Sequence, residues 1–273
     1  MKGNKRFSYP YVLWLLLFTV VPLFIVVYFA FTNSAGEWTV DNFTFMTRYA
    51  NVFARSFRLA IISTLICLIL GYPLAYIMSR LKPQHQTIAM ILIMLPMWMN
   101  FLVRTYAWLT ILENNGLLNN LLEALNLPTL EIINTPTAVA LGMIYNYLPF
   151  MILPIYTAMN KMDKSYIEAA KDMGANERQV FTKVIFPLSI PGVLSGVIMV
   201  FVPAVSTFVI SKILGGGANM LVGDLIEMQF LGSAYNANLG AALSLVMMII
   251  TMIFIWLTGK IDKNGDGEGS VLL

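Results

Sequence analysis

Residues 161 to 192 read KMDKSYIEAAKDMGANERQVFTKVIFPLSIPG, a charged segment between two long apolar runs. Ser165 is followed three residues later by Glu168, which is the spacing of a capping box and predicts that a helix starts at Tyr166. Gly174 can end that helix. The segment therefore predicts a short helix that lies between two membrane spans.

One face of this predicted helix is apolar and small in its middle. Tyr166, Ala169, Ala170 and Met173 fall at positions i, i+3, i+4 and i+7. Small side chains let another surface approach closely, so the pattern predicts a docking helix. Asn176 and Gln179 predict a second capped helix, which leads on through Val180 and Val184 to Pro187.

The composition is that of an integral membrane protein. The chain is 58% hydrophobic and 11% charged, whereas soluble domains are typically about 25% charged. A membrane-spanning helix needs roughly 20 apolar residues. Six runs are long enough, at about 11–31, 59–79, 87–108, 137–158, 189–210 and 239–258. We therefore expect an all-α, polytopic protein in the cell membrane, with residues 1–273 forming one transmembrane domain.

The basic residues predict how the runs are oriented. With the N-terminus inside, 12 of the 17 lysines and arginines fall in cytoplasmic segments and four in outer loops, while Arg104 lies near the outer end of the third run. This excess favours cytoplasmic N- and C-termini. The loop at 159–188 is then cytoplasmic, and the tail at 260–273 is predicted to be disordered. Since the net charge of +3 is explained by topology, nucleic-acid binding has no support.

The outer loops are expected to hold short helices that lie on or between the spans. Amphipathic patterns occur within residues 32–58 and 113–136. The third outer segment, residues 212–238, is too short and interrupted to cross a bilayer and is expected to be interfacial or partly inserted.

The apolar runs leave little room for an internal energy source. A proton-coupled carrier usually has ionisable residues among its helices, yet Arg104 alone falls within a run, near its end. The one histidine, His85, lies in a short inner loop. The chain has no G-x-x-x-x-G-K-[ST] phosphate loop, no metal-ligand cluster and no G-x-S-x-G elbow. We expect a non-enzymatic subunit without catalytic residues, metal or cofactor of its own.

The segment at 161–192 resembles the EAA motif of ATP-binding-cassette (ABC) importer permeases. The matching residues are Glu168, Ala169, Ala170, Gly174 and, at the end of an apolar stretch, Pro187. Val-Ile-Phe-Pro stands where the family more usually has Ile-x-Leu-Pro. The resemblance implies the ABC type I importer permease fold with six transmembrane helices. It also implies that this segment is the cytoplasmic coupling helix, which fits a groove on an ATPase subunit that uses ATP and Mg.

Three stretches resemble the B-type permease subunits of spermidine/putrescine importers: YNYLPFMILPIY at 145–156, MDKSYIEAAKDMGA at 162–175 and GGGANMLVGDLIEMQF at 215–230. The resemblance implies transport of polyamines by alternating access. Its implied partners are a second related permease, an ATPase dimer, an extracytoplasmic polyamine-binding protein and the lipid bilayer. The alternative is an ABC importer for an amino acid, an opine-like cation or a metal chelate; a secondary carrier is the rival from another class.

A polyamine is a flexible, multiply charged cation that carboxylates and aromatic faces can hold, and each aromatic contact contributes about 0.5–2 kcal/mol. Candidate pathway residues are of three kinds: aromatic residues near span ends, polar residues within spans and an acid in the glycine-rich outer loop. They are Trp98, Tyr106 and Tyr145, then Asn100 and Asn146, and finally Asp224. The alternative for the aromatic residues is an interfacial belt or the protein core. Lys212 and Arg104 would oppose the passage of a cation unless they face away or pair with acids.

Overall fold

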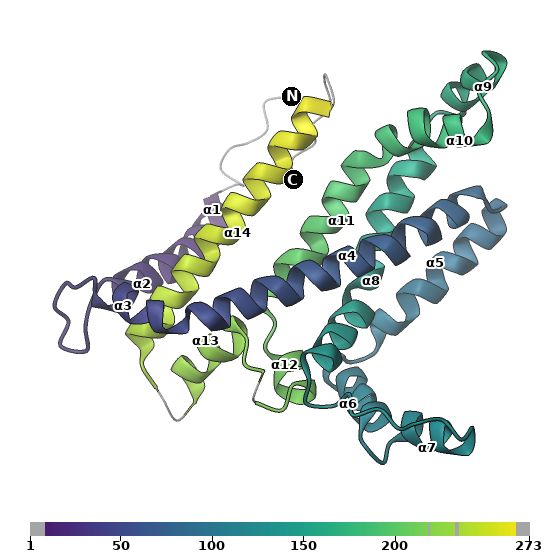
Figure 1. Cartoon of the computed structure of the whole chain (residues 1–273). Helices are drawn as coiled ribbons and strands as arrows, with labels where there is room; N and C mark the ends of the chain where they lie inside the picture. The colour runs from purple at the N-terminus through teal and green to yellow at the C-terminus, as the bar shows by residue number, and fades with distance from the viewer. Residues whose placement is uncertain (1–8, 218, 233–234, 266–273) are drawn as a thin grey trace.

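The computed structural model describes residues 9–217, 219–232 and 235–265. In these ranges the chain is helical apart from loops and one isolated bridge between Thr32 and Trp38. Five helices are long and apolar enough to cross a membrane, and a helix pair bent by 90° brings the number to six if the pair is counted as one span. Figure 1 shows long helices with shorter ones gathered at their two ends. The fold is therefore an all-α, multi-pass membrane fold, as the composition predicts.

The helices follow one another along the chain with short connections. In order they are α1 (Tyr9–Leu15), a π-helical turn (Leu16–Val20), α2 (Val21–Ala30), α3 (Asp41–Met46), a 3-10 turn (Thr47–Tyr49), α4 (Ala50–Arg80), α5 (Pro83–Trp98), α6 (Phe101–Leu112), α7 (Leu117–Ala124), α8 (Pro136–Lys161), α9 (Lys164–Asp172), α10 (Glu177–Val180), a second π-helical turn (Phe181–Ile185), α11 (Phe186–Ser206), α12 (Val209–Leu214), α13 (Val222–Leu231) and α14 (Ala237–Gly265).

Helices α4, α8 and α11 pack together to form the core. At its centre Met151 of α8 is fully buried. A Cβ atom added at Gly71 of α4 would lie 3.0 Å from the Cγ of Met151, and one added at Gly196 of α11 would lie 2.8 Å from its Sδ. Small residues at helix crossings let the backbones approach closely, which is how membrane helices gain packing energy. The two glycines thus make room for Met151 between three helices.

The third predicted run, 87–108, is divided between two helices instead of forming one. α5 ends at Trp98 and α6 begins at Phe101, and the two axes meet at 90°. Pro96 lacks a backbone donor, which weakens the end of α5. The Asn100 side chain accepts hydrogen bonds from the amides two and three residues later, at 2.9 and 3.3 Å, and so caps the new helix.

The fifth span starts much earlier than predicted. A continuous helical stretch covers Glu177–Ser206, so residues 177–188 of the predicted loop 159–188 belong to the same helix as the span at 189–210. The helix ends at Ser206, before α12. The segment between α8 and this long helix is thereby reduced to α9 and two turns.

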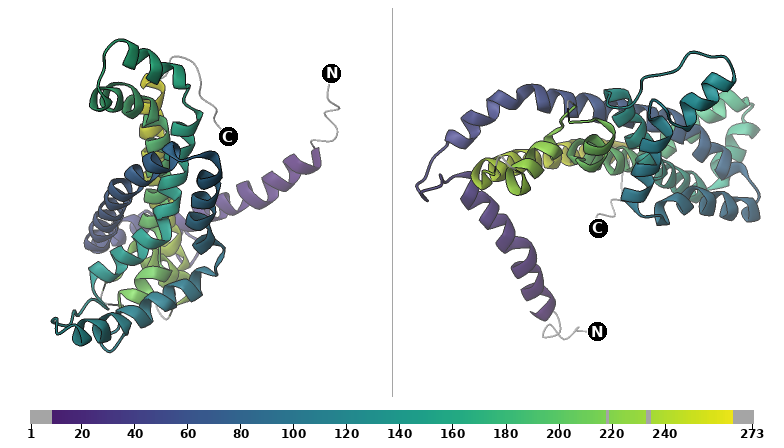
Figure 2. Two further views of the ribbon diagram at one scale, coloured as in Figure 1. Left: turned by 90° about the vertical axis from the view of Figure 1, so that its right-hand side faces the viewer. Right: turned by 90° about the horizontal axis from the view of Figure 1, so that it is seen from below.

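The first helix projects from the rest of the molecule (Figure 2). α2 packs against α14, whereas α1 projects away in both views of Figure 2. At the other terminus α14 continues to Gly265, past the start of the predicted disordered tail at 260–273. The remainder of that tail, and the basic residues Lys2, Lys5 and Arg6 used to predict the orientation, lie outside the described residues.

Helices occur in the predicted outer loops. α3 lies in the first outer loop and α7 in the second. In the third outer segment, α12 precedes the glycines at 215–217 and α13 follows them. In Figure 1, α6, α7, α12 and α13 gather at one end of the bundle, and α9 and α10 at the other. The predicted coupling residues on α9 and the predicted pathway residue Asp224 on α13 consequently lie at opposite ends of the molecule (Figure 1).

Candidate docking corner and candidate pathway residues

Helix α9 begins at Lys164, two residues earlier than predicted. The cap is Asp163 and not Ser165, because an Asp163 carboxylate oxygen accepts a hydrogen bond from the backbone amide of Ser165 at 2.9 Å. That bond lowers the pKa of Asp163. The prediction from Ser165 and Glu168 was wrong because an aspartate two positions before Ser165 already satisfies the first free amide.

Gly174 ends α9, as predicted. Its φ is +81°, a conformation in which a Cβ atom is strained. The amide of Gly174 donates to the carbonyl of Lys171 at 2.9 Å, and the amide of Ala175 to that of Ala170 at 3.0 Å. These two bonds form a Schellman motif. A Cβ added at Gly174 would meet no atom of residues 9–217, 219–232 or 235–265 within 4 Å, so the position favours glycine for its backbone conformation.

The second predicted cap is confirmed at the start of α10. The Asn176 side chain accepts a hydrogen bond from the Gln179 amide, and the Gln179 side chain accepts one from the Asn176 amide, each at 2.9 Å. Across the turn, Lys171 Nζ lies 2.6 Å from Glu177 Oε1, and this contact lowers the pKa of Glu177. We call the segment 163–179, with its two helix ends and the turn between them, the docking corner.

The apolar stripe predicted on α9 is split between two faces. Tyr166, Ala169 and Met173 are exposed, and Met173 is 88% accessible. Ala170 is half-buried and packs, with Ile167, against the core. The docking corner thus offers an outward apolar surface with a small residue in the middle. Of the other motif residues, Glu168 on α9 and Pro187 in the first turn of α11 are also exposed.

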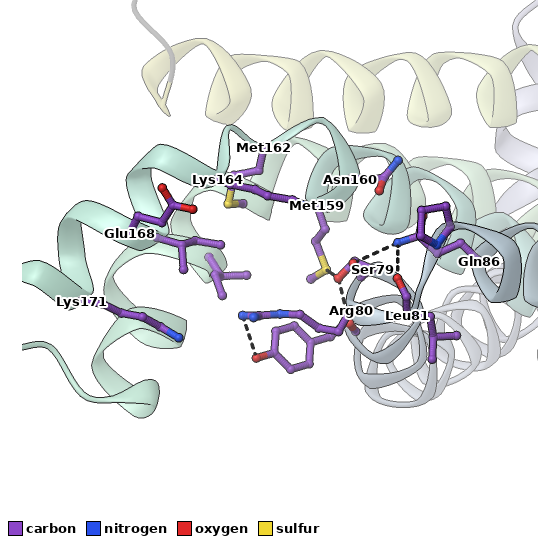
Figure 3. Close-up of a pocket in the computed structure, with 14 residues that line it drawn as sticks. Ser79, Arg80, Leu81, Gln86, Met159, Asn160, Met162, Lys164, Glu168 and Lys171 are labelled. Carbon is purple, nitrogen blue, oxygen red and sulfur yellow. Dashed lines mark hydrogen bonds between the residues drawn. The ribbon is translucent and has the colours of Figure 1, made fainter.

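A hollow of about 580 Å³ lies behind α9, between it and the ends of α4, α5 and α8. In Figure 3, the charged ends of Arg80 and Lys171 point towards this hollow from opposite sides. The Arg80 guanidinium lies 5.2 Å from the centre of the Tyr76 ring and donates to its hydroxyl at 3.3 Å. Glu168 also lines the hollow. The sequence did not identify Arg80 as a candidate site residue. The signal that could have pointed to it is a basic residue at the inner end of the second apolar run.

The predicted pathway residues on α5 and α6 lie around the 90° break. Trp98 is 78% accessible at the end of α5, and Asn100 is the helix cap already described. Tyr106 is exposed and lines a hollow of about 400 Å³ together with Phe208 and Lys212.

The predicted residues on α8 have partners within the protein. The Tyr145 ring makes an edge contact with Trp108, at 5.1 Å between centroids, and the Arg104 guanidinium lies 5.9 Å from its centre. Arg104 is buried and also donates to the carbonyl of Pro96. The amide nitrogen of buried Asn146 donates to the carbonyl one turn earlier at 2.8 Å. Arg104 therefore packs in the protein beside the helix break.

Asp224 and Lys212 meet at a third hollow, of about 310 Å³, between α12 and α13. One carboxylate oxygen of Asp224 accepts a hydrogen bond from the Leu221 amide at 2.8 Å, and burial raises the pKa of the group. Lys212 Nζ lies 2.9 Å from Glu227 Oε1, which also lines the hollow. Lys212 therefore pairs with an acid, and Glu227 is a residue that the sequence reasoning did not select.

The structure does not bring all six predicted pathway residues into one hollow. Tyr106 and Asp224 each share a hollow with Lys212, whereas Asn146 is buried within the packed core. The end of the bundle opposite the docking corner thus has two adjacent hollows, one mostly apolar and one with two carboxylates.

The chain matches the model of a protein family described as binding-protein-dependent transport system inner membrane component, over residues 1–264. It is 36% identical to the spermidine/putrescine transport system permease protein PotB of Haemophilus influenzae over 260 residues, which cover 92% of this chain and 91% of the relative. It is 33% identical to PotB of Escherichia coli K12 over 268 residues, covering 93% and 98%.

Among solved structures, the fold is similar to a chain of a bacterial ABC transporter involved in the import of the acidic polysaccharide alginate. The TM-score is 0.81 at 14% sequence identity, and the match covers 96% of this chain and 97% of the other. At that identity the likeness establishes a shared fold and carries nothing about cargo.

Proposed function

Because the chain belongs to the family of binding-protein-dependent transport system inner membrane components, we propose that it is the transmembrane permease subunit of an ATP-driven polyamine importer. The observation that carries the cargo is the similarity to spermidine/putrescine permeases, which extends over nearly the full length of both chains at 33–36% identity. A resemblance confined to the docking corner would support the importer class alone.

The proposed complex has several partners. An extracytoplasmic binding protein delivers the polyamine, as the family description implies. A second related permease completes the pathway, and a pair of ATPase subunits binds and hydrolyses ATP with Mg. This chain is a non-catalytic membrane component that receives its energy through the docking corner.

The exposed face of the docking corner supports contact with an ATPase. Tyr166 and Met173 provide apolar area on either side of Ala169, so a partner surface can approach the helix backbone between them. The two helix caps and the Lys171–Glu177 pair hold α9 against α10. A displacement of α9 by the partner would therefore move the long helix that begins at Glu177.

The orientation of the chain follows from this proposal. An ATPase works in the cytoplasm, which places the docking corner and both termini on that side, in agreement with the distribution of lysine and arginine. The hollows beside Tyr106, Lys212 and Asp224 then face the outer side, where the binding protein delivers its cargo. Alternating access would open the pathway first towards that side and then towards the cytoplasm.

Reconstitution tests the proposed function directly. The chain would be placed in proteoliposomes with its partner permease, ATPase and binding protein. We expect spermidine- or putrescine-loaded binding protein to raise ATP hydrolysis and to drive uptake of the labelled polyamine. Stimulation by an amino acid, an opine-like cation or a metal chelate, with none by any polyamine, would overturn the polyamine assignment and leave the permease assignment standing.

A further inference from the structure

The ion pair between Lys212 and Glu227 joins two short helices at the proposed outer end of the bundle. Lys212 lies in α12 and Glu227 in α13, and their charged atoms are 2.9 Å apart. The lysine side chain is 62% accessible and the glutamate 23%. The ammonium is therefore free to leave, whereas the carboxylate is held in the wall of the hollow.

The chemistry of this lysine matches that of the proposed cargo. A lysine side chain carries its ammonium on a flexible four-carbon stem, which is an aminobutyl group. Putrescine is a diaminobutane, and spermidine contains the same aminobutyl unit. Lys212 thus presents to Glu227 the group that a polyamine would present.

The surrounding hollow suits the rest of such a molecule. Its volume is about 310 Å³. Asp224 supplies a second carboxylate, one of whose oxygens is buried without a hydrogen-bond partner among the described residues. Met220 and Met228 supply apolar wall, against which methylene groups can pack. A cavity with carboxylate and apolar lining is what an alkyl diammonium requires.

We propose that Lys212 is a tethered competitor of the cargo: it occupies Glu227 until the primary ammonium of a polyamine replaces it. This inference rests on the proposed function and names the group that receives the cargo at the outer end. Lys212 also lines the neighbouring hollow with Tyr106, so the released side chain has a second surface to occupy. Tyr106 is exposed and lines that hollow, and aromatic rings can hold a cation. Replacement of one ammonium by another keeps Glu227 neutralised throughout.

Carbodiimide coupling tests the exchange in the purified full complex. The carbodiimide converts a carboxylate into a reactive O-acylisourea ester. A neutral amine within reach attacks the acyl carbon, the urea leaves, and an amide forms. Without added amine we expect a Lys212–Glu227 cross-link, identified by mass spectrometry of peptides. With labelled putrescine we expect less cross-link and a putrescine amide on Glu227. Glu123, an exposed carboxylate on α7, provides the reference yield within the same sample.

Two matched variants make the test decisive. Lys212→Met removes the competing ammonium, whereas Lys212→Arg keeps the charge and cannot be coupled. At one putrescine concentration, the yield at Glu227 relative to Glu123 should be about two- to five-fold higher in the methionine variant, the range expected for loss of a partly exposed ion pair. Equal relative yields in the two variants would overturn the inference.

Transport measurements separate this inference from the proposed function. If the wild-type complex takes up polyamines and the two variants give equal relative yields at Glu227, the tethered competitor is refuted and the proposed function stands. If the wild-type complex takes up no polyamine, the proposed function is wrong, and a polyamine is then not the molecule that replaces Lys212 at Glu227.

Discussion

Gly174 stands at the turn between α9 and α10 with a φ of +81°, and a Cβ added there would meet no atom of the part of the chain that the structure describes. Gly174→Ala therefore tests backbone conformation alone, at a cost of about 1–2 kcal/mol for a left-handed alanine. We expect the alanine variant to hydrolyse ATP with less polyamine uptake per ATP. Asparagine tolerates the left-handed conformation, so Gly174→Asn should retain more coupling. Equal ratios of uptake to hydrolysis in both variants would contradict this account.

Glu168 is exposed on α9 and lines the hollow behind it. If its role is contact with the ATPase, Glu168→Gln should lower polyamine-driven uptake while leaving the thermal unfolding temperature of the complex unchanged. Asp172→Asn, at another exposed acid of the same helix, is the matched control. Normal coupled uptake in the Glu168 variant would remove Glu168 from the docking surface.

The Lys171–Glu177 contact makes the turn sensitive to acid. The hydrogen bond and charge of Lys171 lower the pKa of Glu177 in the folded protein. The contact therefore stabilises the folded turn above the pKa that a glutamate has in the unfolded chain, and this stabilisation is lost as the pH falls through the folded pKa. Hydrogen exchange of residues 174–179, compared between wild type and Glu177→Gln at the same pH values, would measure this stabilisation. We expect extra protection in wild type at neutral pH that disappears in acid. A difference independent of pH would disprove the prediction.

At the scale of the elements, the crossing of α8 and α11 depends on Gly192. A Cβ there would lie 2.6 Å from the Cβ of Ala158 and 2.7 Å from the carbonyl oxygen of Pro154, and neither can rotate away. Overpacking of this kind costs about 1–3 kcal/mol, so Gly192→Ala should lower the thermal unfolding temperature. A Cβ added at Gly259 in α14 would meet no atom of the described residues within 4 Å. Gly259→Ala should leave stability unchanged or raise it, because alanine favours helix. Similar changes in the two variants would be inconsistent with a tight crossing.

Sequence reasoning predicted those elements whose cause is local. Apolar runs long enough for a bilayer predicted the helices, and the Asn176–Gln179 spacing predicted a cap that the structure contains. The start of α9 was missed because two adjacent candidates, Asp163 and Ser165, compete for the same amide. The 90° break was missed because Pro96 and Asn100 were read separately, one as a kink and the other as a polar group within a span, whereas together they end one helix and cap the next.

The site residues that were missed depend on tertiary contacts. Glu227 becomes a candidate site residue because it pairs with Lys212, which lies fifteen positions earlier on another helix. The sequence pattern does not show that these two helices meet. Arg80 lies next to the docking corner because the ends of α4 and α8 line the same hollow behind α9. Periodicity identifies the buried face of each helix, and the packing of the whole bundle decides which faces meet.

At the scale of the whole molecule, the proposed orientation can be tested by sided labelling. The single cysteine, Cys67, is fully buried and should not react with a membrane-impermeant maleimide. Met173→Cys, at the docking corner, should react only from the cytoplasmic side. Glu123→Cys, on α7 at the opposite end, should react only from outside. Reaction of both variants from one side, in intact and inverted vesicles, would refute the orientation.

The helical stretch from Glu177 to Ser206 has 30 residues, including the π-helical turn at Phe181–Ile185, and is therefore about 45 Å long. It starts within the docking corner and ends two residues before Phe208, which lines the hollow of Tyr106 and Lys212. A rod of that length that tilts by about 5° about one end displaces its other end by about 4 Å. Mechanical leverage through one covalent element would therefore carry a push at the docking corner to the opposite end of the bundle, without a relay of side-chain contacts.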